Sequence, residues 1–219
     1  MSNCLDESGA CGCIDKIERV EYIKYLGILI DQRLTWKAHL DYVTKKVRKL
    51  IHKFYELRNV MPIKMLKMVY FSLVESIISY GIVTWGSASA SAMSSLLIAQ
   101  KYIIKIIMFK NRGFSTELLF KESNLLTLGQ LYIKAVIRFM LNNQYYRNEL
   151  LHNHYTRNAV NQNVSLAFVR RSASQGHISY VGPLIFNALP FSFRNKPFKK
   201  IKNKIGQWIM ENSFLFNFL

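Results

Sequence analysis

The chain has 219 residues, of which 50% are hydrophobic and 13% aromatic, so it holds enough apolar material for a packed core and is not predominantly disordered. Thirty Lys and Arg residues against 13 Asp and Glu residues give a formal net charge of +17. This charge favours polyanionic partners, nucleic acid first and an anionic membrane second. The alternative is a basic surface that only keeps the protein soluble.

The three cysteines, Cys4, Cys11 and Cys13, all lie at the N-terminus. An odd, clustered set does not fit a disulfide framework and indicates a reducing, intracellular compartment, cytoplasmic or nuclear. With no histidine nearby, the set also falls short of a four-ligand zinc site. No basic start leads into an apolar run, so we expect no signal peptide and no secretion. Residues 1–13 are interpreted as a flexible lead-in.

Two strand-like runs follow, at residues 13–20 and 21–30, and then a turn at residues 31–33. We therefore expect a short β element over residues 14–34. Asp31 ends the second run. A lone aspartate cannot hold a pair of metal ions, so it is interpreted as a structural turn residue.

A long helix is predicted over residues 36–58, with Thr35 as its cap. Its apolar residues recur three or four positions apart and form one stripe: Leu40, Val43, Val47, Leu50, Phe54 and Leu57. Basic residues gather on and beside the opposite face: Lys45, Lys46, Arg48, Lys49, His52 and Lys53. The charge of this helix is organised rather than scattered.

Further helices are predicted in the rest of a helical domain over residues 35–148. Pro62 suits the first turn of a helix that runs to about Tyr80. Residues 68–85 are long enough to span a membrane, but Glu75 and several serines favour a buried core helix. The next helix, over 90–110, is apolar on nearly all sides and carries Lys101 and Lys105 on one face. Shorter helices are expected at 115–123, capped by Ser115 or Thr116, and at 127–146.

Composition changes after Asn148, and residues 149–219 are interpreted as a C-terminal extension. Residues 152–165 indicate a polar loop, and "YVGPLIFNALP" (180–190) indicates an ordered turn. A final basic helix is predicted after Pro197. The whole chain is thus expected to be mainly α: a helical bundle with a short N-terminal β-hairpin and an irregular extension that ends in a helix.

Signals for catalysis are weak. Nucleotidyl transfer through two metal ions needs clustered carboxylates, but the 13 acidic residues are dispersed, with no Asp-Asp pair and no Asp-x-Asp. His152 and His154 fit a polar loop better than a metal site. No nucleophile motif, phosphate-binding glycine loop or Cys-x-x-Cys occurs. We predict no catalytic residue, no bound metal and no cofactor.

Several segments are similar to a known family. "IKYLGILIDQRLTWKAHL" (23–40) resembles the segment just past the catalytic palm in reverse transcriptases of non-LTR (LINE-type, jockey-like) retrotransposons. "LRNVMP", "YFSLVESIISYGIVTWG" and "LLIAQKYIIKII" resemble the elements that follow it in this family. "HNHYTRN" and "YVGPLIFNALP" are similar to C-terminal elements, with Phe186 where tryptophan is more usual. The order and spacing of these segments extend the resemblance from residue 14 to residue 210.

This resemblance implies a helical thumb that grips template and primer, preceded by a palm–thumb junction with the primer-grip strand "YLGILID". The family's palm motif, Tyr-x-Asp-Asp, is absent from the chain, which implies a truncated, non-catalytic fragment that extends no primer; Mg²⁺ would be needed only by the palm. The candidate nucleic-acid-binding residues are Lys24, Tyr25, Gly27, Lys45, Lys46, Arg48, Lys49, Lys53, Lys101 and Lys105.

The expected partner is an RNA–DNA or DNA duplex, contacted at its phosphates without sequence specificity. A palm-containing reverse transcriptase is a second candidate partner, and no small-molecule substrate is expected. Two alternatives stay open. The chain is a stand-alone helical module, recruited by a host to bind nucleic acid or protein, or it is a transposon remnant without function.

Overall fold

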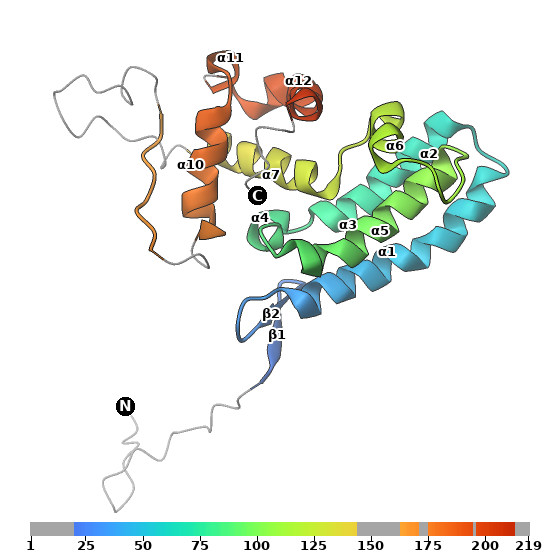
Figure 1. The fold of residues 1–219 in the computed structure, drawn as a ribbon, viewed down its shortest axis with the longest axis horizontal. Helices are drawn as coiled ribbons and strands as arrows, with labels where there is room; N and C mark the ends of the chain where they lie inside the picture. Colours follow the sequence, from blue (N-terminus) through green and yellow to red (C-terminus); the bar gives the residue numbers. More distant parts are fainter. Residues whose placement is uncertain (1–19, 144–162, 171–174, 195, 213–219) are drawn as a thin grey trace, which may run out of the picture.

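The computed structural model describes residues 20–143, 163–170, 175–194 and 196–212. Figure 1 shows a mainly helical protein with an N-terminal two-stranded hairpin and a helix close to the C-terminus, so the predicted fold class is confirmed. Several predictions fall on residues outside the described ranges. They concern the three cysteines, His152, His154 and the strand-like run at 13–20, of which only Val20 is described.

The hairpin pairs β1 (Tyr22–Tyr25) with β2 (Ile28–Asp31) in antiparallel register, Tyr22 opposite Asp31 and Tyr25 opposite Ile28. The single strand expected over residues 21–30 is therefore wrong. Leu26 and Gly27 both have positive φ, 46° and 82°, and form the tight two-residue turn that suits the twist of a hairpin. Gly27 adopts this conformation without a steric penalty, since it has no Cβ.

Helix α1 (Lys37–Arg58) begins after Trp36, and the expected cap by Thr35 is wrong. Asp31 provides the oxygens instead. Its Oδ2 accepts hydrogen bonds from the backbone N–H (2.9 Å) and hydroxyl (2.6 Å) of Thr35, and its Oδ1 accepts one from the N–H of Trp36 (2.8 Å). The Thr35 hydroxyl thus donates to Asp31, and no side chain among the described residues caps the first turn of α1.

Three helical segments form the body of the protein (Figure 1). Helix α1 packs along α5 (Ala90–Ile107), and both contact the segment between them in sequence. That segment contains α2 (Ile63–Val69), the π-helix η1 (Tyr70–Glu75) and α3 (Ser76–Ser79). Its buried side chains meet the apolar stripe of α1, of which Val47 and Phe54 are fully buried. Pro62 lies immediately before the first turn of α2, as its position in the sequence predicts.

The residues tested as a membrane span, 68–85, do not form one helix. Tyr80 is extended (ψ 117°) and Gly81 is left-handed (φ 61°), and together they separate α3 from the single turn of α4 (Ile82–Trp85). Among the described residues, one helix, α5, is long and apolar enough by length and composition to cross a bilayer. Helix α5 packs along α1, and 39% of its residues are buried.

Two further helices join the body to the C-terminal part. Helix α6 (Thr116–Ser123) contacts α5, and Ser115 precedes it without a capping hydrogen bond. Helix α7 (Leu128–Asn142) begins with a capping box, in which Thr127 and Gln130 bond each other's backbone N–H groups. Gln100 of α5 secures the preceding loop, since its Nε2 donates to the Leu126 carbonyl (3.0 Å) and the Tyr70 hydroxyl (2.9 Å).

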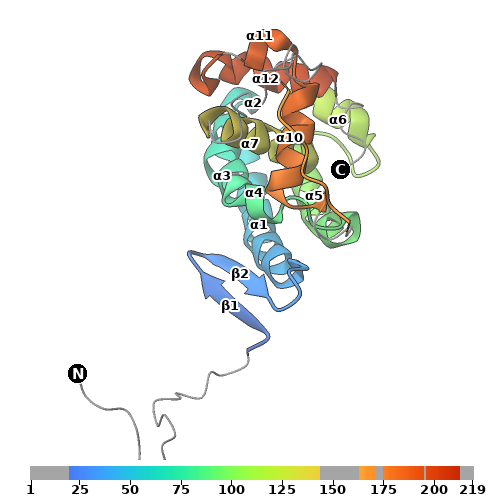
Figure 2. The same ribbon diagram turned by 90° about the vertical axis from the view of Figure 1, so that its left-hand side faces the viewer.

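Three helices form the C-terminal part: α10 (Ile178–Ala188), α11 (Phe191–Arg194) and α12 (Phe198–Glu211). Of these, α10 and α12 pack on α7 (Figures 1 and 2). The turn expected at residues 180–190 is wrong, because most of it is helix α10, with Pro183 inside. Gly182 permits a close approach, since a Cβ there would lie 2.7 Å from the Sδ of Met140 on α7. The basic helix expected after Pro197 is confirmed as α12.

Candidate nucleic-acid interface

Five basic residues of α1 form what we call the α1 basic face. All five side chains are exposed, while the opposite side of the helix is buried in the body. The described residues contain one lysine–glutamate ion pair, Lys110–Glu122 (2.7 Å), and one histidine–glutamate contact, His52–Glu56 (3.3 Å), and neither involves this face. In the part of the chain that the structure describes, no acidic side chain therefore lies within ion-pair distance of these five cations. The five residues are Lys45, Lys46, Arg48, Lys49 and Lys53.

The aromatic ring of Tyr42 connects the hairpin to this face. Lys46 Nζ lies 4.3 Å from the centroid of the ring, and Lys24 Nζ, from strand β1, lies 5.9 Å from it. A hydrogen bond with Lys46, followed by the charges of Lys46 and Lys24, holds the pKa of Tyr42 below its ordinary value. The structure thus brings two predicted residues, 22 positions apart, to one ring.

Tyr42 is absent from the residues predicted from sequence. The available signal is its spacing, because an aromatic residue four positions before a lysine lies beside it on a helix. Tyr25, which is predicted, is 62% exposed on β1 next to the turn. Gly27 lies in the turn itself, close to Tyr80, whose Cε1 would be 3.5 Å from a Cβ at that position.

Two side chains of the helical body fix β2 and the turn. The Tyr80 hydroxyl donates to the Leu26 carbonyl (2.6 Å), and Nδ1 of the buried His39 accepts the N–H of Leu29 (3.3 Å). Burial, followed by the charge of Lys46, lowers the pKa of His39. The ring is therefore neutral at physiological pH and serves as an acceptor for the hairpin.

Asp31 fixes the other end of β2. Partial burial acts to raise the pKa of its carboxyl, but the hydrogen bonds from Thr35 and Trp36 outweigh burial, and the pKa lies below its ordinary value. The carboxylate is ionised at neutral pH and is fully occupied with the start of α1. Its position fits a turn residue between hairpin and helix.

Lys101 and Lys105 differ from the lysines of α1 because both are half-buried. Lys105 donates from Nζ to the carbonyl of Arg112, so it holds the loop that follows α5. Lys101 forms no hydrogen bond or ion pair within the described ranges. The structure does not join these two residues to the α1 basic face by any contact that it describes.

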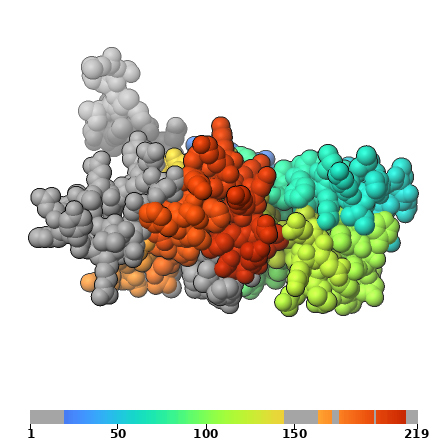
Figure 3. Space-filling model, turned by 90° about the horizontal axis from the view of Figure 1, so that it is seen from above, coloured from blue at the N-terminus to red at the C-terminus, as the bar shows by residue number. Residues whose placement is uncertain are grey.

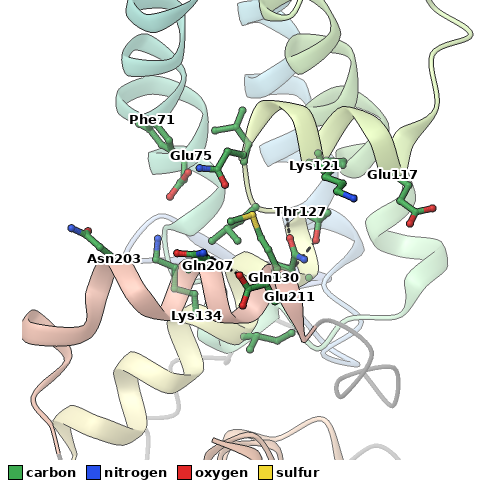
Figure 4. A pocket seen from close by; sticks show the side chains of 18 of the residues that line it. Phe71, Glu75, Glu117, Lys121, Thr127, Gln130, Lys134, Asn203, Gln207 and Glu211 are labelled. Carbon is green, nitrogen blue, oxygen red and sulfur yellow. Dashed lines mark hydrogen bonds between the residues drawn. The ribbon is translucent and has the colours of Figure 1, made fainter. Parts of the chain in front are cut away.

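A separate groove of 1390 Å³ opens between η1, α6, α7 and α12 (Figure 4). Glu75 lies at its wall, where burial raises the pKa of the carboxyl and the charges of Lys134 and Lys202 oppose the rise. Glu117 and Glu211 add acidic groups to the lining. Mixed charge makes this groove a poorer surface for a polyanion than the α1 basic face.

Metal-ligating residues do not gather in the described part of the chain. Over residues 20–143, 163–170, 175–194 and 196–212, no group of three His, Cys, Asp or Glu side chains is arranged to hold a metal ion. The candidate interface consists of cations beside an aromatic ring, and lysine and arginine side chains are the groups that can contact phosphate by charge and hydrogen bonding.

Comparison with curated proteins finds a similarity over part of the chain. No protein-family model matches the chain, and no solved structure matches it significantly. Among curated proteins, the probable RNA-directed DNA polymerase from transposon BS of Drosophila melanogaster is 30% identical over 94 residues, which are 42% of this chain. The match spans 10% of the length of that relative. The similarity shows that this chain contains a region related to reverse transcriptases.

Proposed function

We propose that the protein grips template–primer nucleic acid as the thumb-like part of a reverse transcriptase of the non-LTR (LINE-type, jockey-like) class, and is itself non-catalytic. The similarity to a transposon polymerase supports the relation to reverse transcriptases. The helical body with an N-terminal hairpin is consistent with the thumb expected from the sequence resemblance.

The observation that carries the proposal is the α1 basic face. Lys45, Lys49 and Lys53 recur every four residues, so they share one side of a rigid helix at intervals of about 6 Å. A straight row of exposed ammonium groups can contact successive phosphates of one nucleic-acid strand. Such contacts position a duplex but read no base sequence.

The hairpin adds one cation next to the α1 basic face. Lys24 shares the Tyr42 ring with Lys46, so a sixth cation adjoins the five of the α1 basic face. With six phosphate contacts, the logarithm of the binding constant should fall with the logarithm of salt concentration at a slope of about −5.

Binding to duplexes across a salt series tests the proposal. RNA–DNA hybrids of two unrelated sequences, and DNA duplexes of the same sequences, are titrated by fluorescence anisotropy. The proposal expects similar affinities for the two sequences and a steep, linear loss of affinity with salt. Affinity that stays flat between low and moderate salt, or that depends strongly on sequence, contradicts it.

A further inference from the structure

The end of α5 holds a bulky residue in a conformation that side chains disfavour. Phe109 has φ +55°. Its N–H bonds the Ile106 carbonyl (3.2 Å), and the N–H of Lys110 bonds the Lys105 carbonyl (2.9 Å), which together form a Schellman motif. Glycine usually occupies the left-handed position of this motif, because a Cβ strains the backbone there. A phenylalanine at such a position is rare, and strained backbone of this kind often occurs at functional sites.

The strained backbone presents an aromatic ring at the surface. The Phe109 side chain is 49% exposed, although burial would be more favourable for an apolar ring of this size. The guanidinium carbon of Arg58, at the last residue of α1, lies 4.3 Å from the centroid of the ring. The arginine covers one part of the ring and leaves another part open to solvent.

More rings and a second arginine lie beside this pair. Tyr55, one turn before Arg58, is 43% exposed and meets Tyr102 of α5 edge to face, with ring centroids 6.5 Å apart. The guanidinium carbon of Arg112 lies 5.8 Å from the Tyr102 ring. The hydroxyl of Tyr102 raises the pKa of Tyr55, and the charges of Arg112 and Arg58 oppose the rise, so both cations act on the same tyrosine. We call this cluster the loop patch: Tyr55, Arg58, Tyr102, Phe109 and Arg112.

Two acidic residues of the segments that flank the loop patch have partners. Glu56 lies 3.3 Å from His52, and Glu122 forms an ion pair with Lys110 at 2.7 Å. Lys105 holds the carbonyl of Arg112, which orders the loop that carries the second arginine. The loop patch therefore combines two arginines with partly exposed aromatic rings on an ordered backbone.

We propose that the loop patch binds single-stranded nucleic acid, with unstacked bases against Phe109 and Tyr55 and with phosphates beside Arg58 and Arg112. Aromatic rings interleaved with arginines are suited to this ligand, since every base has a π face to stack and every nucleotide a phosphate. Arg58 follows Tyr42 by 16 positions, which is about 24 Å along α1. The patch thus lies at the end of α1 remote from the hairpin (Figure 1), and Figure 3 shows the cyan and yellow-green segments together there at one end of the molecule. It adjoins the Lys53 end of the α1 basic face but shares no residue with it.

Two oligomers of equal charge test this site. One is an oligothymidylate of about 12 nucleotides, and the other is an abasic oligomer of the same length, which keeps the phosphates and lacks the bases. The protein should prefer the oligothymidylate by roughly 5- to 150-fold for each base that stacks. An oligouridylate should behave like the oligothymidylate, because stacking does not require the 2′-hydroxyl.

The decisive variant is Phe109→Gly. It removes the ring and relieves the backbone strain, so its melting temperature should equal or exceed that of the wild type. It should lose most of the preference for bases and keep its affinity for the abasic oligomer and for duplexes. Asn124→Gly is the matched control, because Asn124 also has positive φ (54°) at a helix end and carries no ring.

The proposal is overturned if the wild type binds both oligomers equally, if Phe109→Gly retains the preference, or if that variant weakens binding to both oligomers alike. Duplex binding is measured on the same samples. A failure of duplex binding alone therefore counts against the thumb-like function and not against the single-strand site.

Discussion

The phenol of Tyr80 donates a hydrogen bond to the carbonyl oxygen of Leu26 at 2.6 Å, although the two residues are 54 positions apart. Leu26 is the first residue of the hairpin turn, and Tyr80 is the extended residue after α3. The next residue, Gly81, lies under Ile28 of β2, whose Cδ1 would be 2.5 Å from a Cβ at this position. Tyr80 and Gly81 thus hold the hairpin against the helical body. Because Lys24 belongs to the hairpin, they also fix the position of its strand.

Tyr80→Phe should loosen the hairpin without unfolding the body. Tyr80 is 56% exposed, so the variant loses one hydrogen bond of about 1 kcal/mol and no core packing. We expect faster amide hydrogen exchange in residues 22–31 and an unchanged rate in α5. Tyr22→Phe, on an equally exposed tyrosine of β1, is the control. Equal exchange in the two variants would show that the bond does not hold the hairpin.

Asp31→Ala should destabilise the fold by about 1–2 kcal/mol, because the start of α1 loses its hydrogen-bond acceptor. Urea unfolding measures the loss. Asp41→Ala, on the exposed side of α1, should stay within about 0.5 kcal/mol of the wild type. Because the pKa of Asp31 is lowered in the fold, its contribution is full above about pH 4 and is lost as pH falls through the folded pKa. Stability of Asp31→Ala that matches Asp41→Ala at neutral pH would refute this role.

His39 should make the fold sensitive to mild acid. Its side chain is 1% exposed, the Trp85 ring centroid lies 5.6 Å from its own, and its Nε2 has no hydrogen-bond partner among the described residues. The fold lowers the pKa of His39 and so favours the neutral form. The stabilisation is therefore full above the unfolded pKa of about 6.5 and declines as pH falls from there towards the folded pKa.

Thermal unfolding from about pH 7 to about pH 5 measures this effect. His39→Asn should flatten the decline in melting temperature, since asparagine does not titrate and offers an oxygen to the N–H of Leu29. His52→Gln should keep the wild-type decline, because the side chain of His52 is 84% exposed. Parallel declines in the wild type and His39→Asn would assign the acid sensitivity to another group.

Gly86 and Gly206 should respond to alanine in opposite directions. A Cβ at Gly86 would lie 2.2 Å from Cδ2 of Tyr132 and 2.6 Å from the Ile82 carbonyl oxygen, whereas a Cβ at Gly206 has no neighbour within 4 Å. Gly86→Ala should cost about 1–3 kcal/mol through overpacking. Gly206→Ala, in the middle of α12, should stabilise the fold by about 0.5–1 kcal/mol. Denaturant unfolding of both variants checks the signs.

Local sequence signals predict much of the fold. The apolar stripe of α1 and the Thr127 cap of α7 act within one or two turns, so a reader of the sequence can place both helices. Helix α10 is different. Gly182 and Pro183 favour a turn locally, and the helix forms because apolar side chains such as Ile185 become buried when it packs on α7. That gain depends on a partner distant in sequence.

The same distinction applies to the hairpin and to the candidate sites. Leu26 gives no local signal for positive φ, and its turn is held by Tyr80 from another part of the chain. The spacing of the α1 lysines shows that they share an exposed side. It does not reveal that Lys24 of the hairpin reaches the Tyr42 ring, or that Phe109 is exposed at a helix end, because both depend on the paths of neighbouring segments.

The most direct test of nucleic-acid binding by the α1 basic face removes three positive charges from one of two exposed helical surfaces. One variant combines Lys45→Gln, Lys49→Gln and Lys53→Gln on α1, and the matched variant combines Lys199→Gln, Lys200→Gln and Lys204→Gln on α12. For an RNA–DNA hybrid, the α1 variant should lose affinity, and the magnitude of its salt slope should fall by about 3. The α12 variant should keep a slope close to that of the wild type. Equal losses in the two variants would show that the total charge of the protein, and not the α1 basic face, determines binding.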